Sequence, residues 1–382
     1  MSTVPAELVD LILSNLAGRH LEAPSLVCRA WLPIARSRYT LKIHNRRAFR
    51  GLDCILDAEC TFLPAVRNII VVQADSRIIL PNLSRFSALD NLELHGIHLR
   101  ADIPSLPRLA KVVLFFCIFE DFKSTIQSLE NITASGTLRD FTWDGTRWYI
   151  GDDDDDTQRA AIEAKRTFTF ERMYLGWYVR FRCDVFPFCL RAKNLTLGCY
   201  LSDDWIPVAA EYLRALGSII EIIFLKDCYS LGRDAPAGGL VDLAPLTQLH
   251  TLKLGSALFY TITNAGDTQL LLDRYVETVL GQITAPLRSL VLCVDAPPDS
   301  PAQDPAKTTS LTHLFSILDH NPRLRAIPKL GFVMGRPCQH WLYQEVDGPA
   351  SDRATAAAVA STLRASVPDA WLGRVYFDEA LI

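Results

Sequence analysis

One apolar pattern recurs along most of the chain and limits what it can fold into. From about residue 60, apolar side chains take the first, fourth and sixth positions of short segments, the spacing L-x-x-L-x-L. Ten such triples occur: Val66/Ile69/Val71, Leu89/Leu92/Leu94, Leu109/Val112/Leu114, Leu138/Phe141/Trp143, Phe170/Met173/Leu175, Ala192/Leu195/Leu197, Ile219/Ile222/Phe224, Leu249/Leu252/Leu254, Leu287/Leu290/Leu292 and Leu372/Val375/Phe377. Chance alone gives about one all-leucine triple in a chain of this composition. Three start at Leu89, Leu249 and Leu287, so the pattern predicts a series of strands that face one core.

Helical spacings lie between several of these triples. Apolar residues recur three or four positions apart in 205–216, 272–283, 311–318 and 359–367, which predicts helices there. This alternation resembles a leucine-rich repeat, and Cys117 and Phe119 match the tail of that repeat. We therefore expect an α/β fold in which residues 61–382 form an irregular, leucine-rich-repeat-like solenoid that binds a substrate. The alternative is a doubly wound α/β domain; the lack of a phosphate-binding glycine motif favours the solenoid.

The first forty-five residues follow a different pattern. Pro5 suits the first turn of a helix, Leu8, Leu11, Ile12 and Leu16 form one apolar face, and Gly18 ends it. Two more helices are expected, one from about residue 20 and one over 29–39. Three helices of this length bury too little surface to be stable alone. Their apolar surface is therefore expected to pack on the rest of the chain or on another protein.

This segment resembles an F-box. The match consists of Val4-Pro5-Ala6-Glu7-Leu8 followed by Ser25-Leu26-Val27-Cys28-Arg29-Ala30-Trp31, which is the specific half of the family pattern. The resemblance implies a three-helix, adaptor-binding F-box over residues 1–45 and covers nothing beyond it. We expect a linker helix region over 46–60. The resemblance also implies the residues that dock on the small adaptor protein of a ligase, namely Pro5, Leu8, Ile12, Leu16, Leu26, Val27 and Trp31.

By this resemblance the chain is expected to be the substrate receptor subunit of a cullin–RING (SCF-type) ubiquitin ligase. It would bind the adaptor, and through it a cullin, by the F-box, and an unknown target protein by the repeat domain. Two other functions stay open. One is a leucine-rich-repeat interaction scaffold without a ligase role, which Pro24 favours because proline breaks or kinks the expected second helix. The other is an α/β enzyme with a divergent site.

Composition and motifs argue against several other classes of protein. The net charge of −4 argues against a nucleic-acid partner, and no apolar stretch reaches the ~18 residues that suggest a membrane span. The ten cysteines form no CxxC pair and the N-terminus lacks a secretory signal, so an intracellular protein, cytoplasmic or nuclear, is expected. No nucleotide, metalloprotease or esterase motif occurs. We therefore expect no catalytic residue, metal or cofactor, and no enzyme.

Five consecutive aspartates, Asp152 through Asp156, interrupt the apolar pattern. A run of like charge is typical of a solvated loop or a helix start. The functional alternative is an acidic patch for a basic partner.

Overall fold

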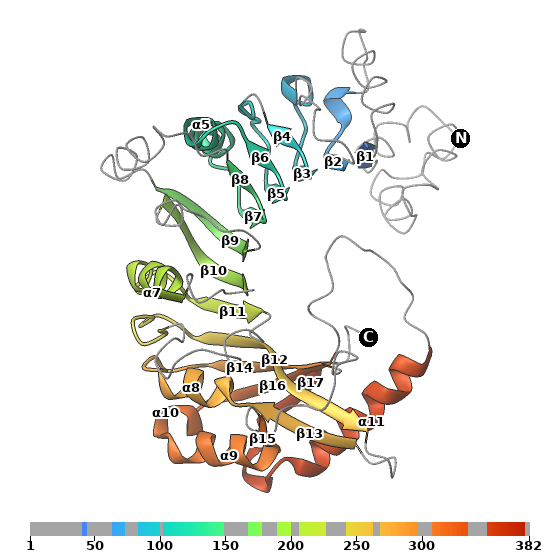
Figure 1. Cartoon of the computed structure of the whole chain (residues 1–382), viewed down its shortest axis with the longest axis vertical. Coiled ribbons are helices and arrows are strands. Elements are labelled where there is room, and N and C mark those ends of the chain that lie inside the picture. Colours follow the sequence, from blue (N-terminus) through green and yellow to red (C-terminus); the bar gives the residue numbers. More distant parts are fainter. Residues whose placement is uncertain are drawn as a thin grey trace, which may run out of the picture. The chain divides into compact units, whose positions relative to one another are not determined.

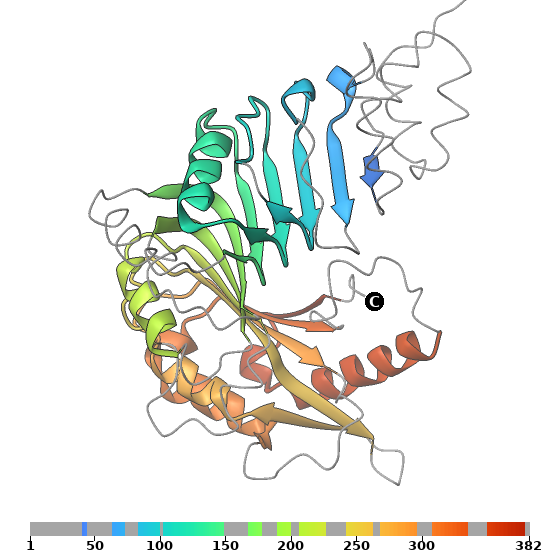
Figure 2. The same cartoon turned by 45° about the horizontal axis from the view of Figure 1, so that its top comes forward.

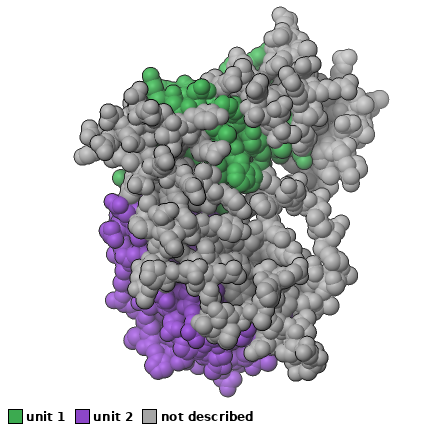
Figure 3. All heavy atoms as spheres, in the orientation of Figure 1, with its two compact units in different colours: residues 1–174, 179–191 green, residues 175–178, 192–382 purple. Residues whose placement is uncertain are grey.

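The computed structural model describes residues 40–43, 63–72, 83–99, 102–148, 167–177, 189–199, 206–226, 242–262, 268–295, 308–334 and 350–378 (Figure 1). The chain divides into two compact units (Figure 3). Unit 1 comprises residues 1–174 and 179–191, and unit 2 comprises residues 175–178 and 192–382. Each unit is built mainly of strands.

Unit 1 contains a sheet with the strand order β1-β2-β3-β5-β7-β9. Its strands are β1 (Thr40–Ile43), β2 (Asn68–Val72), β3 (Asn91–His95), β5 (Lys111–Phe115), β7 (Asp140–Asp144) and β9 (Phe168–Trp177). The pairs from β1 to β7 are all parallel. A second parallel sheet consists of three short strands, which come directly after β3, β5 and β7 in the chain. They are β4 (His98–Leu99), β6 (Ile118–Phe119) and β8 (Arg147–Trp148). Figures 1 and 2 both show β3, β5 and β7 side by side, with these shorter strands beyond their ends.

The core of unit 1 is the face of the sheet that the apolar triples line. Ile69, Leu92, Val112 and Phe141 stand in register across four strands, and each is at most 1% exposed. The ring of Phe141 stacks on that of Phe170 at 4.7 Å between centroids. Burial of such a side chain contributes about 1.5–3 kcal/mol. The strands predicted from the triples are therefore confirmed in this unit.

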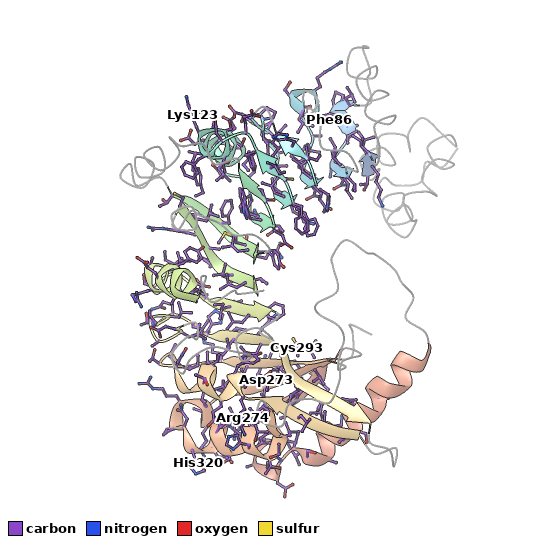
Figure 4. The ribbon with its side chains drawn as sticks, in the orientation of Figure 1. Phe86, Lys123, Asp273, Arg274, Cys293 and His320 are labelled. Carbon is purple, nitrogen blue, oxygen red and sulfur yellow. The ribbon has the colours of Figure 1, made fainter. Side chains whose placement is uncertain are left out.

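One helix covers part of unit 1. Helix α5 (Phe122–Thr133) begins at Asp121, whose side chain accepts a hydrogen bond from Ser124 N at 2.6 Å. It lies next to β6, and buries an apolar face that includes Ile126 and Leu129. Lys123 projects from its exposed side (Figure 4).

Unit 2 contains a sheet with the order β10-β11-β12-β14-β16-β17. Its strands are β10 (Leu190–Cys199), β11 (Ile222–Lys226), β12 (Thr251–Ile262), β14 (Ser289–Asp295), β16 (Lys329–Met334) and β17 (Val375–Asp378). They run parallel, but β13 (Thr268–Asp273) pairs antiparallel with β12, and β15 (Thr308–Ser310) pairs antiparallel with β13. The helices are α7 (Ile206–Ala215), α8 (Tyr275–Gly281), α9 (Leu311–His320), α10 (Pro322–Arg325) and α11 (Ala350–Ser366).

The predicted helices of unit 2 correspond to α7, α8, α9 and α11. Leu272, which we assigned to the second of them, belongs to β13 instead. Figure 1 shows α8, α9 and α10 close together on one side of the strands. None of the described helices has the length and apolar content that a membrane crossing requires.

The expected fold class, a three-helix F-box followed by an irregular leucine-rich-repeat-like solenoid, is wrong. The described residues form seventeen strands and six α-helices, and most of the strands belong to extended mixed β-sheet with parallel and antiparallel pairs. Strands β13 and β15 run against the others, and in its described part the connection from β3 to β5 contains β4 and turns but no α-helix. The triples specify which side chains a strand buries, but not what joins one strand to the next.

The N-terminal predictions fall mostly outside the described residues. The three helices expected before residue 40 and the linker over 46–60 are among them. The last part of the predicted 1–45 segment is described, and it is a strand: β1 pairs in parallel with β2, with Leu41 opposite Ile69.

Two triples were assigned incorrectly. At β11 the buried side chains are Ile220, which precedes the strand, and Ile223 and Leu225 within it. This set is one residue later than the predicted one, which shifts every side chain to the other face. Before β17, Leu372 is 53% exposed, whereas the neighbouring Trp371 is fully buried. A further triple, Ile327/Leu330/Phe332, was missed and forms the core side of β16.

Candidate functional site

The seven residues predicted to bind an adaptor lie outside the described residues. These are Pro5, Leu8, Ile12, Leu16, Leu26, Val27 and Trp31. The structure therefore brings none of them together, and their role stays a prediction. The site described below lies in unit 1, on the face of the sheet opposite the core, which we call the outer face.

Polar side chains line the outer face where the strands begin. Asn68, Asn91, Lys111 and Asp140 stand opposite one another on β2, β3, β5 and β7. Asn91 Nδ2 donates to Asn68 Oδ1 at 2.5 Å. Arg172 on β9 donates from Nε and Nη2 to the two carboxylate oxygens of Asp140, at 2.5 and 2.6 Å. This bidentate geometry holds neighbouring strands together through their side chains.

Glu93 occupies the middle of β3 on the same face and is bound by two cationic or potentially cationic neighbours. Lys111 Nζ donates to Glu93 Oε1 at 2.9 Å, and His95 Nε2 lies 3.7 Å from Oε2. His95 and Lys111 lower the pKa of Glu93 to about 2, against the opposing effect of burial. Glu93 is therefore a carboxylate at neutral pH and suits an ion pair better than a role as an acid.

Three neighbouring strands of the outer face are each followed by an equivalent turn. Strands β3, β5 and β7 are each followed by a residue with a left-handed backbone: Gly96 (φ 67°), Phe116 (φ 50°) and Gly145 (φ 58°). The turns are linked by hydrogen bonds of 2.7 Å, from Gly96 N to Phe115 O and from Phe116 N to Asp144 O. Two of the three positions hold glycine, the residue that adopts this conformation without strain. The middle position holds phenylalanine.

Phe116 is one of the few large apolar side chains exposed in the described part of the chain, at 37%. Its ring packs edge-on against the ring of Phe115, with 4.4 Å between centroids. It also lies over Gly145, where an added β-carbon would be only 2.5 Å from Cδ1 and Cε1 of the ring. The absence of a side chain at residue 145 therefore makes room for the ring.

Two buried groups lie beside this turn. His95, across from Phe115 on β3, is 5% exposed, and among the described residues neither of its ring nitrogens has a hydrogen-bond partner. Cys117 follows Phe116 and is completely buried, with Sγ 3.2 Å from Leu94 O. Burial raises the pKa of the Cys117 thiol to about 12, so it does not form the thiolate that a nucleophile needs.

No metal centre is formed by the described residues, since no three or more His, Cys, Asp or Glu side chains cluster among them. The described residues at this site present an exposed aromatic ring next to charged and polar side chains.

Unit 2 offers a useful comparison. Tyr376 on β17 is 40% exposed, and its ring lies over Gly331 on β16, where an added β-carbon would be 2.5 Å from the ring. Lys329 precedes Gly331 by two residues on β16 and is exposed. Each unit thus has an exposed aromatic ring that lies over a glycine of the neighbouring strand or turn.

Comparison with known proteins adds nothing to this geometry: no family model matches the chain, and no curated protein sequence does. The sequence did contain a signal for the site that we did not use. Gly96, Phe116 and Gly145 each stand two residues after the last member of an apolar triple. Alignment of those three triples would have identified Phe116 as a phenylalanine in a glycine position.

Proposed function

We propose that this chain is the substrate receptor subunit of a cullin–RING ubiquitin ligase. It binds the ligase adaptor through residues 1–45 and holds a target protein on the outer face of unit 1. The observation that carries the proposal is the sequence Ser25-Leu26-Val27-Cys28-Arg29-Ala30-Trp31, at the F-box spacing after Pro5-Ala6-Glu7-Leu8. Such a receptor works inside the cell, in the cytoplasm or the nucleus.

The receptor needs no catalytic residue of its own. It acts by proximity, because a bound target meets activated ubiquitin at a high effective concentration. The outer face suits such a role, since its strands are cross-linked by ion pairs such as Arg172–Asp140 and it presents an aromatic ring in a defined position. Target contacts of this kind require a rigid surface more than reactive groups.

An interaction scaffold without a ligase role is the second candidate. Pro24 favours it, because a proline within the second helix of the adaptor-binding motif removes a hydrogen bond and weakens that helix. In this case residues 1–45 are dispensable for binding of the target.

Co-expression with the ligase adaptor tests the proposal. The complex is measured by size-exclusion chromatography with light scattering, for the wild-type chain and for the Leu8→Ala/Trp31→Ala variant. Leu372→Ala is the matched control, because this leucine is exposed in unit 2. We expect a one-to-one complex for the wild type and the control and none for the double variant. A folded wild-type chain that binds no adaptor rules out the receptor function and leaves the scaffold.

A further inference from the structure

We propose that the bond between Asp144 and Gly145 is a site of spontaneous covalent modification, at which Asp144 converts to isoaspartate through a cyclic imide. The reaction needs only water, so it depends neither on an adaptor nor on a target protein. Three features of the turn after β7 support it: the dipeptide Asp-Gly, the N–H of Gly145, and the hydrogen bond that Asp144 O accepts in the turn.

The conversion leaves the composition of the chain unchanged. The backbone nitrogen of Gly145 attacks Cγ of Asp144 and loses its proton, and the carboxyl oxygen leaves as water, which closes a five-membered imide. Water then opens the ring at one of its two carbonyl carbons. Opening at Cγ restores aspartate. Opening at the former backbone carbonyl leaves isoaspartate, in which the chain runs through Cβ and Cγ of residue 144.

Glycine after the aspartate favours this cyclisation. A β-carbon on the following residue crowds the approach of its own backbone nitrogen to the carboxyl carbon, whereas glycine allows a close approach. Among the described residues Asp144 is the one aspartate that a glycine follows, and none of the described asparagines precedes a glycine. Asp144 is also partly exposed, so water reaches the reacting carboxyl group.

The N–H of Gly145 lies at the end of a ladder of hydrogen bonds between the turns. Gly96 N donates to Phe115 O, and Phe116 N donates to Asp144 O, each at 2.7 Å. No described residue accepts the N–H of Gly145, although this glycine is buried. A buried N–H without a partner is rare and unfavourable. Cyclisation removes this N–H, and no hydrogen bond has to break at the nitrogen before it attacks.

Isoaspartate at residue 144 changes the support of the Phe116 ring. Asp144 O accepts the N–H of Phe116 as a main-chain carbonyl, but after conversion it belongs to a carboxylate outside the main chain. The path from Asp144 to Gly145 also becomes longer by a carbon atom. Because the ring lies directly over Gly145, displacement of this glycine changes what lies beneath the ring. The modified turn therefore holds the exposed ring less firmly.

Incorporation of heavy oxygen tests the inference, because each opening of the imide adds one oxygen atom from the solvent. The folded full chain is incubated at neutral pH in water enriched in heavy oxygen, and is then digested in ordinary water. Cleavage after Arg139 and Arg147 releases Asp140 and Asp144 in one peptide, so fragment ions assign the label. Asp140 precedes Phe141 and is the internal reference. We expect label at Asp144 at least about tenfold faster, which equals about 1.4 kcal/mol of activation free energy.

Three variants separate the chemistry from effects on folding. Asp144→Glu keeps the charge and the backbone acceptor but requires a larger ring, and Gly145→Ala crowds the attack. Both should lower labelling at residue 144 at least about tenfold. Gly136→Ala changes another left-handed glycine, which follows Ser135, and should be labelled like the wild type. In the isoaspartyl form of the wild type, the amide of Phe116 should exchange its hydrogen faster than in the unmodified chain.

Labelling of Asp144 that is no faster than that of Asp140 overturns the inference. Labelling that appears only after the chain is unfolded in urea also overturns it, since the native turn then prevents the reaction. Wild-type labelling of Asp144→Glu would show that the oxygen enters without the five-membered imide. An unchanged exchange rate of the Phe116 amide in the isoaspartyl form contradicts the effect on the ring.

Discussion

Substitution of Gly145 tests whether the ring of Phe116 packs directly over this glycine. Gly145→Ala introduces two costs: a left-handed alanine, about 1 kcal/mol, and a β-carbon 2.5 Å from the Phe116 ring. Phe116 is 37% exposed, so complete loss of its buried area amounts to about 2–4 kcal/mol at 25 cal/mol per Å². We expect Gly145→Ala to cost about 2–3 kcal/mol in all, because the ring shifts and keeps part of its contacts.

The matched control is Gly136→Ala. Gly136 also has a left-handed backbone, with φ 68°, but an added β-carbon meets no atom within 4 Å. Its substitution should cost only the backbone term of about 1 kcal/mol. In a Phe116→Gly background the cost of Gly145→Ala should fall to that same value, since the ring is gone.

The assay is urea-dependent hydrogen exchange, followed at the amide of Phe116, which donates to Asp144 O at 2.7 Å. This amide reports the local stability of the turn and does not require the whole chain to unfold in one step. Equal costs for Gly145→Ala and Gly136→Ala would refute the reasoning. So would a cost of Gly145→Ala that is the same with and without the ring.

Three further outcomes follow from the described contacts. Glu93 has a pKa of about 2 in the folded chain and an ordinary value of 4.5, so its contribution to stability is present above pH 4.5 and lost between pH 4.5 and 2. Glu93→Gln should therefore lower the urea midpoint at pH 7, and the difference in midpoint between variant and wild type should shrink between pH 4.5 and 2. Cys117 should resist iodoacetamide at pH 8 in the native chain and react after unfolding, as measured by mass spectrometry, because it is buried and its pKa is about 12. Gly217→Ala should lower the free energy of unfolding by more than about 2 kcal/mol, since its β-carbon would collide with the carbonyl oxygen of Pro245, whereas Gly281→Ala, with open space around it, should change it by less than about 0.5 kcal/mol.

The sequence predicted the strands better than the fold that they form. Triples such as Leu89/Leu92/Leu94 place every apolar side chain on one face of a strand, and that periodicity holds locally whatever follows the strand. The connections carry no comparable signal. Strand β13 pairs antiparallel with β12, and Leu272 of β13 was assigned to a helix because a short apolar run suits either element. Strand β15 pairs antiparallel with β13 and has the sequence Thr308-Thr309-Ser310, which carries no apolar pattern.

The single-residue errors have a simple physical cause. On β11 nearly every position is apolar, so the sequence does not distinguish Ile219/Ile222/Phe224 from the buried set one residue later. Burial by the neighbouring strands decides the register, and that information is not local. We made no prediction for Phe116 from the sequence, because its backbone angle and its exposure depend on the packing of neighbouring strands.

The most direct test of the central claim, that this chain binds a ligase adaptor through residues 1–45, is a pull-down with immobilised adaptor. The adaptor is incubated with the wild-type chain, with Leu8→Ala/Trp31→Ala or with the control Tyr376→Asn, and the retained chain is quantified. We expect the wild type and Tyr376→Asn to be retained and Leu8→Ala/Trp31→Ala to be lost. A folded wild-type chain that is not retained would contradict the claim, as would full retention of Leu8→Ala/Trp31→Ala.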